Sequence, residues 1–183
     1  FLTGYQKIYF FFTDNDTFVN ELAQKLNIKH FVSKIRHRGF PADTLYRYHY
    51  FLTQKFNLLL NTDVVYYLDV DMSIESKVGS EVLPNINEPI VCTKHPGHYD
   101  IHGAFDALCG SPETNINSTA YIVLGRERPC YVAGGFNGGM TENFIKMASS
   151  IKQMIDIDDD NEIVAVWHDE SHLNKYFSDK LFT

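Results

Sequence analysis

Two aspartates stand directly behind an apolar run in the stretch "VVYYLDVDMS", and their spacing is the first sign of chemistry. The run is rich in β-branched and aromatic residues, which predicts a buried strand that ends just before Asp69 and Asp71. Residues i and i+2 of a strand face the same way, so we expect the two carboxylates side by side. Such a pair is stable when it shares a divalent cation, Mg²⁺ or Mn²⁺, whose shell a ligand phosphate completes. The simpler alternative is two acidic turn residues, one of which caps a helix at "IESKVG".

The same motif also fits a phosphatase of the haloacid-dehalogenase type, in which the first aspartate, here Asp69, is the nucleophile. In that class the motif ends the first strand and is usually followed by a glycine-rich turn. Here at least two strand-like segments precede the motif, and "MSIES" contains no glycine. The position of the motif therefore disfavours the phosphatase, which stays the alternative enzyme.

The segment "WHDESHLNKY" (167–176) gathers residue types that bind sugars and move protons. His168 and His172 are four apart and would share a helix face, but the order is not H-E-x-x-H and no third zinc ligand is evident. Trp167 offers a ring that stacks on a sugar, while Asp169 or Glu170 offers a carboxylate that stabilises an oxocarbenium ion. The plain alternative is a helix start rich in capping residues. A non-catalytic carbohydrate-binding module using Trp167 and the histidines also fits.

Three further segments have weaker signals. In "AGGFNGG" (133–139) four glycines either let the backbone approach a ligand closely or make a tight hairpin turn. "HPGHY" (95–99) has the composition of a Pro-Gly turn. "DIDDDNE" (156–162) lacks the glycine and glutamate of a calcium-binding EF-hand loop, so we interpret it as a solvated acidic turn.

The totals limit the class of protein. A chain of 183 residues with 44% hydrophobic and 14% aromatic residues fits one folded domain and excludes a disordered protein. The net charge of −7 argues against nucleic acid as a partner and suits a cation site. Cys92, Cys109 and Cys130 are scattered and odd in number, as in a protein with free core thiols. No apolar run approaches the roughly 18 residues that a membrane span needs.

Periodicity predicts the elements that must position these residues. Residues 7–16 and 29–35 are expected as strands flanking a helix at 17–26, and residues 39–60 as one long helix with Asp43 as its N-cap. With the strand before Asp69, this order predicts an α/β protein with a mostly parallel sheet and helices on its faces.

The second half is less regular. We expect a helical turn at 78–84, a strand at 89–95, and short strands at 120–125 and 130–140. Residues 96–120 form an irregular segment of the kind that is usually functional. A helix at 141–158, with Thr141 as a possible cap and an apolar stripe of Phe144, Met147, Ile151 and Met154, precedes a strand that turns helical near Asp169.

Taken together, "YLDVDM", "HPGHY", "STAYI", "AGGFNGG" and "EIVAVWHDESHLNKY" resemble glycosyltransferase family 6 in order and spacing. This is the retaining family of the histo-blood-group A and B transferases and the α1,3-galactosyltransferase. The resemblance implies a single domain over residues 1–183 of the GT-A type, with a Rossmann-like, mostly parallel sheet. From the resemblance we expect the family's first strand to lie before Phe1 and its C-terminal tail to lie after Thr183, outside the given residues.

The resemblance also implies roles for individual residues on the donor side. Asp69 and Asp71 resemble the pair that binds Mn²⁺ (Mg²⁺ is possible) and the UDP diphosphate. Glu170 resembles the essential acid below the anomeric carbon, Asp169 the acid that grips donor hydroxyls, and Arg47 the arginine that grips the donor.

Ala133, Gly134 and Gly135 resemble the tripeptide that selects the donor sugar, and a glycine in its third place leaves room for the N-acetyl group of UDP-GalNAc. His95, Trp167 and His168 resemble acceptor contacts. The expected reaction is transfer of GalNAc, or Gal, from UDP to a terminal galactose of a glycan, with an α1,3 link and retention. A soluble bacterial or viral relative in the cytoplasm is expected, or a Golgi enzyme if a missing N-terminus carries an anchor.

Overall fold

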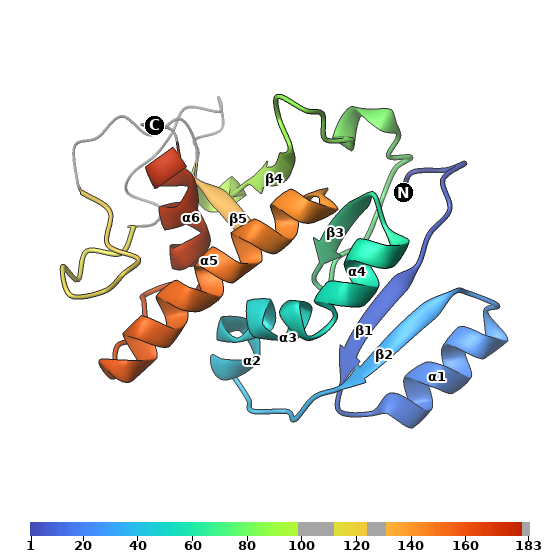
Figure 1. Ribbon diagram of the computed structural model, residues 1–183, viewed down its shortest axis with the longest axis horizontal. Helices are drawn as coiled ribbons and strands as arrows, with labels where there is room; N and C mark the ends of the chain where they lie inside the picture. Colours follow the sequence, from blue (N-terminus) through green and yellow to red (C-terminus); the bar gives the residue numbers. More distant parts are fainter. Residues whose placement is uncertain (99–111, 124–130, 181–183) are drawn as a thin grey trace.

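A computed structural model describes residues 1–98, 112–123 and 131–180, and its helices and strands follow a mixed α/β order (Figure 1). The mixed α/β class predicted from the sequence is therefore confirmed. Cys109, Cys130, the end of "HPGHY" and parts of the predicted 96–120 and 120–125 segments lie outside the described residues.

The first unit is a small parallel sheet with one helix. Strands β1 (Tyr9–Thr13) and β2 (His30–Lys34) pair in parallel, and α1 (Asp16–Lys25) connects them. Asn15 caps α1 by accepting the N–H of Phe18 at 3.2 Å. The predicted strand, helix and strand are confirmed, and the unit lies at one end of the molecule (Figure 1).

The second sheet is antiparallel. Its order is β3 (Val64–Leu68), β5 (Val132–Met140), β4 (Ile90–Lys94), with β5 in the middle. The prediction of a mostly parallel sheet is wrong for the described strands, because parallel pairing is confined to β1 and β2. An apolar run predicts a strand but carries no information on the direction of its partner.

The glycine-rich segment forms one continuous strand, so the predicted short strands around a hairpin turn are wrong. A Cβ added at Gly138 would clash with the backbone oxygen of Val65, and one added at Gly139 would clash with that of Pro89. These two glycines therefore let β5 lie close between its neighbours.

The predicted long helix at 39–60 is three short ones. They are α2 (Ala42–Leu45), α3 (Arg47–Thr53) and α4 (Lys55–Asn61), with breaks at Tyr46 and Gln54. Asp43 is not an N-cap; its carboxylate accepts the backbone N–H groups of Arg38 at 2.8 Å and Gly39 at 3.0 Å. It thus fixes the loop that leads into α2 instead of the helix end.

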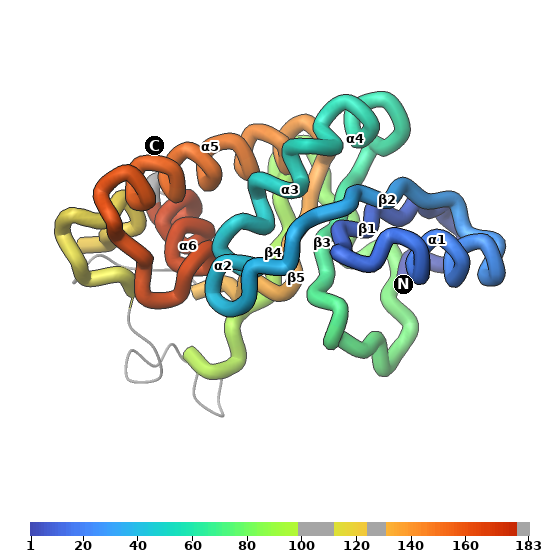
Figure 2. Tube along the Cα trace, turned by 90° about the horizontal axis from the view of Figure 1, so that it is seen from below, coloured from blue at the N-terminus to red at the C-terminus, as the bar shows by residue number. Residues whose placement is uncertain are grey.

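Two C-terminal helices complete the core. Helix α5 (Thr141–Asp160) confirms the predicted helix, and α6 (His168–Lys180) follows it. Figure 2 shows α5 running along one side of the molecule, with α3 and α6 beside it. The stripe of α5 is buried at Phe144, Met147 and Ile151, and each such side chain contributes about 1.5–3 kcal/mol to folding. Met154 packs at the edge of this core. Thr141 is the first helical residue, not the cap, and its hydroxyl donates to the carbonyl of Thr62 at 2.9 Å.

Other predictions have mixed outcomes. The helical turn before the fourth strand is present at Ser80–Val82, and Pro96–His98 forms another short turn. Residues 120–123 and 162–167 are not strands. The acidic run is the end of α5 rather than a solvated turn, and Asp158 is only 1% exposed. Within the described ranges, no helix is both long enough and apolar enough to cross a membrane.

Candidate active site

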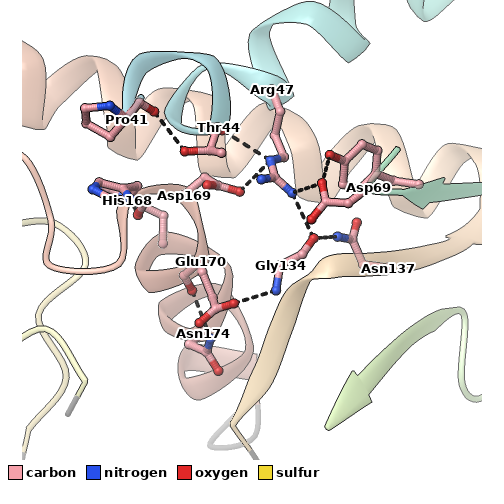
Figure 3. Close-up of polar contacts among 12 residues, drawn as sticks. Pro41, Thr44, Arg47, Asp69, Gly134, Asn137, His168, Asp169, Glu170 and Asn174 are labelled. Atoms are coloured by element: carbon pink, nitrogen blue, oxygen red, sulfur yellow. Dashed lines mark hydrogen bonds and ion pairs between the residues drawn. The ribbon is translucent and has the colours of Figure 1, made fainter. Parts of the chain in front are cut away.

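Most of the predicted site residues lie together, near the end of one strand and near the starts of another strand and a helix. The end of β3, the first half of β5 and the first turn of α6 converge on Arg47, the first residue of α3 (Figure 3). These elements are far apart in the sequence, so the fold brings the residues together.

Arg47 is the centre of the cluster and is only 7% exposed. Its Nη1 donates to the carbonyl of Gly134 at 3.0 Å and lies 3.3 Å from Asp69 Oδ1. Its Nε donates to the carbonyl of Thr44 at 3.2 Å and lies 2.9 Å from Asp169 Oδ2. A single guanidinium thus links β3, β5 and α6, which its planar, multiply donating group makes possible.

Asp69 stands at the end of β3. Its Oδ1 accepts hydrogen bonds from the hydroxyl of Tyr67 and from the guanidinium of Arg47. Its backbone N–H donates to the carbonyl of Gly135 at 2.9 Å. Its side chain is about 35% exposed, and Asp71 is exposed on the surface two residues later. Asp69 is therefore oriented by the protein, while Asp71 is open to solvent.

A bulge in β5 places Gly135 beside Asp69 and Gly134 beside Asp169 and Glu170. Cys92 pairs with Asn137, but Lys94 pairs with Val132, so β5 has three extra residues at this point. A Cβ added at Gly135 would lie 2.8 Å from Asp69 Oδ2. The absence of a side chain there lets the strand pass close to the acid.

Two polar side chains fix this bulge to its surroundings. Asn137 is fully buried, and its Nδ2 donates to the carbonyl of Gly134 at 3.1 Å. Asn174 of α6 accepts the N–H of Val132 and donates to its carbonyl, both at 2.9 Å, and donates to the carbonyl of Glu170 at 2.9 Å. The sequence analysis missed both residues. The only signal for Asn174 was its place one helical turn after Glu170.

Glu170 and Asp169 lie on the first turn of α6. Glu170 Oε2 accepts the N–H of Gly134 at 2.7 Å, which aims the carboxylate at the β5 bulge. Asp169 is 3% exposed, and burial raises its pKa to about 7, with Arg47 opposing the rise and Glu170 adding to it. Its Oδ2 makes a close ion pair with Arg47 but accepts no hydrogen bond from any of the described residues. A ligand hydroxyl directed at that oxygen would satisfy it.

Of the three predicted acceptor contacts, His95 lies beside the Glu170 carboxylate, and Trp167 and His168 stand just before Glu170 in the chain. His95 Nε2 lies 4.0 Å from Glu170 Oε1, and its Nδ1 accepts the N–H of Gly97 at 3.1 Å. The proton of the neutral ring is then on Nε2, which makes His95 a donor on the side of Glu170. His168 packs edge-on against the exposed ring of Phe40, and burial lowers its pKa. Trp167 is 45% exposed. Ala133 is half-buried at the start of the bulge.

A group of possible metal ligands among the described residues was not predicted from the sequence. One ligand atom each of His95, His98 and Glu170 lies within 4.8 Å of the others. Two imidazoles and a carboxylate are the donor types of zinc. Binding through His95 Nε2 would nevertheless break the hydrogen bond from Gly97, because Nδ1 would then carry the proton. The geometry therefore favours a proton, not a metal ion, on this nitrogen.

The His168 and His172 pair is not a metal site here. Both ring nitrogens of the buried His172 lie within hydrogen-bond distance of oxygens, those of Asp158 and of the His168 carbonyl.

Comparison with known proteins places the site in a family context. A sequence model of glycosyltransferase family 6 matches residues 1–181. The chain is 32% identical to histo-blood group ABO system transferase 1 of Rattus norvegicus, over 96% of this chain and 49% of that protein. It is 24% identical to globoside alpha-1,3-N-acetylgalactosaminyltransferase 1 of Gallus gallus, over 97% of this chain and 50% of that protein. It is 25% identical to the O-antigen biosynthesis glycosyltransferase WbnI of Escherichia coli, over 97% of this chain and 70% of that protein. The chain thus spans about half the length of the two animal relatives.

Proposed function

The chain belongs to glycosyltransferase family 6, and on that premise we propose that it transfers GalNAc from UDP to a terminal galactose, forming an α1,3 link with retention. UDP-Gal is the alternative donor. The relatives named as ABO and globoside transferases support a glycan acceptor and a nucleotide-sugar donor.

One observation supports this proposal best: Arg47 lies between the acid that ends β3 and the acids that begin α6. A nucleotide sugar carries a diphosphate at one end and an electrophilic anomeric carbon at the other. A site for it needs charge neutralisation on one side and a carboxylate on the other. Arg47, together with a cation held by Asp69, would supply the neutralising charge, and Glu170 beside Asp169 would supply the carboxylate.

The residues at the β3 end fit a hard divalent cation. Asp69 Oδ1 is engaged by Arg47 and Tyr67, and Oδ2 faces the side of Gly135 that lacks a side chain. Asp71 offers a second, exposed carboxylate, and all-oxygen donors suit Mn²⁺ or Mg²⁺. When bound, such an ion would neutralise the developing charge of the UDP leaving group.

The protein side of the reaction follows from the other contacts. Arg47 binds donor oxygens while it holds Asp69 and Asp169 in place. Asp169 Oδ2, which accepts no hydrogen bond from the described residues, accepts a hydroxyl of the donor sugar. Glu170, held by the N–H of Gly134, stabilises positive charge at the anomeric carbon.

The β5 bulge is proposed to select the donor. Gly135 leaves the volume beside Asp69 without a side chain, and Ala133 is small. In the family that the sequence resembles, a glycine in the third place of this tripeptide goes with UDP-GalNAc, so UDP-GalNAc is the favoured donor. His95, Trp167 and His168 are proposed to contact the galactoside, with the N–H of His95 donating to an acceptor hydroxyl.

We also propose that residues 1–183 form a single domain of the GT-A type. Family membership supports this reading over the phosphatase with Asp69 as nucleophile and over the carbohydrate-binding module.

The test is a donor competition assay. The chain is incubated with Mn²⁺, a β-galactoside and equal amounts of UDP-GalNAc and UDP-Gal, and the product linkage is determined by NMR. We expect an α1,3-linked GalNAc product, and a loss of about 10²-fold or more in kcat for Glu170→Gln, which keeps the shape but removes the charge. Equal or better use of UDP-Gal would contradict the donor assignment. An unimpaired Glu170→Gln variant would remove Glu170 from the catalytic role.

A further inference from the structure

A buried ion pair joins the last turns of α5 to the first turn of α6. His172 is fully buried and Asp158 is 1% exposed, and His172 Nε2 lies 3.1 Å from Asp158 Oδ2. The other ring nitrogen, Nδ1, lies 2.9 Å from the carbonyl of His168. Because both nitrogens face oxygens, an imidazolium donates to both and pairs its charge with the carboxylate.

The same carboxylate holds a third part of the chain. Asp158 accepts the hydroxyl of Ser118 at 2.5 Å and the N–H of Thr119 at 2.7 Å. The same segment is tied to the approach to α6 through Glu113, which accepts the N–H of Val166 at 2.6 Å. The ion pair therefore connects residues 112–123 with the turn that begins α6.

That turn has an unusual backbone at the residue whose carbonyl His172 binds. His168 has a φ of 52°, in the left-handed region that few residues other than glycine adopt. This conformation sets the directions of Trp167 and His168, the expected acceptor contacts. A strained residue persists only when its surroundings hold it, and the bond from His172 is one such restraint.

The donor side of the site has restraints of its own. Asp169 is paired with Arg47 at 2.9 Å, and Glu170 accepts the N–H of Gly134 at 2.7 Å. Neither contact involves His172. A change at His172 is therefore expected to act on the acceptor side of the turn more than on the donor side.

We propose that His172, held by Asp158, is a positioning residue that fixes the Trp167–His168 turn for acceptor binding. The acceptor role rests on the proposed function. The positioning itself does not, so the two are tested separately.

Two substitutions at His172 separate its two hydrogen bonds. An asparagine amide takes the place of Nδ1 and keeps the bond to the His168 carbonyl, whereas a glutamine amide takes the place of Nε2 and reaches only the side chain at position 158. Each is paired with Asp158→Asn, because an unpartnered buried charge could prevent folding. The matched control is His49→Gln, since His49 binds Asp156 of the same helix at 2.8 Å, away from the turn.

The first readout is the fluorescence of Trp167, the single tryptophan of the chain. We expect acrylamide quenching to change in Asp158→Asn/His172→Gln, and to stay as in the unchanged protein in Asp158→Asn/His172→Asn and in His49→Gln. Equal quenching in the two double variants would overturn the proposal. This measurement needs no turnover, so its result stands even if the proposed function fails.

The second readout is kinetic. We expect the glutamine double variant to raise the acceptor KM by about tenfold or more, while the donor KM stays within about twofold, because a small misplacement of a binding group has a large effect. The asparagine double variant is expected to restore the acceptor KM. Equal rises in both KM values, or no rescue by asparagine, would contradict a positioning role confined to the acceptor turn.

Discussion

Replacing Arg47 with methionine tests the electrostatics of the site most directly. Methionine keeps an unbranched apolar side chain next to Tyr67, over whose ring the guanidinium lies at 4.9 Å, but removes the charge. The substitution leaves Asp169 buried without its cationic partner. The resulting loss of stability is expected to depend on pH.

The sign follows from the pKa of Asp169. Its folded-state pKa is about 7 and its ordinary value is 3.8, so between these values the folded protein holds a proton that the unfolded chain has released. Asp169 therefore lowers stability progressively as pH rises from about 4 to 7, by roughly 4 kcal/mol in all, since each pKa unit corresponds to about 1.4 kcal/mol.

Loss of Arg47 increases this penalty, because its charge is the main influence that lowers the pKa of Asp169. For each unit by which that pKa rises, the variant loses about 1.4 kcal/mol more at pH 9 than the unchanged protein does. At pH 5 the carboxyl group is protonated in both proteins. The loss there is about 1–3 kcal/mol, mainly from the carbonyl of Thr44, because the carbonyl of Gly134 keeps its hydrogen bond from Asn137.

The assay is urea unfolding at pH 5 and pH 9. The control is Arg38→Met, since Arg38 is exposed and lies over the ring of Tyr46 at 4.7 Å, and its loss is expected to stay within about 0.5 kcal/mol at both pH values. The same loss of stability for Arg47→Met at pH 5 and pH 9 would refute the reasoning, as would a loss no larger than that of Arg38→Met.

Three further outcomes are expected. Gly135→Ala places a methyl group 2.8 Å from Asp69 Oδ2. In steady-state kinetics it should raise the KM for UDP-GalNAc by about tenfold, and the KM for UDP-Gal by less. Equal effects on both donors would contradict the proposal that the β5 bulge selects the donor sugar. Excess EDTA should abolish transfer, and Asp71→Asn should weaken Mn²⁺ binding by about tenfold in calorimetry with UDP present; full activity in EDTA would reject the Asp69 and Asp71 assignment. The rate should rise with pH through about 7 as Asp169 ionises to accept a donor hydroxyl, and Asp169→Asn should remove this limb of the pH–rate profile.

The sequence predicted those parts of the site that are local. The strand that ends before Asp69, the helix predicted over 141–158 and the helical start near Asp169 each follow from the pattern of adjacent residues. Family resemblance added Arg47, which lies in a helix that gives no chemical signal of its own.

Other residues could not be found in this way because their partners are distant. The glycines around Asn137 predict a turn residue, yet Asn137 is fully buried in the central strand and fixes the β5 bulge. The acidic run around Asp158 predicts a solvated turn, yet Asp158 is buried and binds His172, Ser118 and Thr119. A polar residue in a sequence is exposed by default, and only a partner supplied by the fold makes its burial stable.

The sequence by itself determined the kinds of residue that carry the chemistry and the short elements that present them, because local conformation depends on neighbours a few positions away. Only the tertiary structure decided that β5 runs antiparallel between β3 and β4, and that Arg47 reaches a carbonyl 87 positions later in the chain. These arrangements depend on contacts between segments that no local pattern relates. The pKa of Asp169, and with it the predicted pH dependence, is a consequence of burial and charge that exists only once those segments have packed.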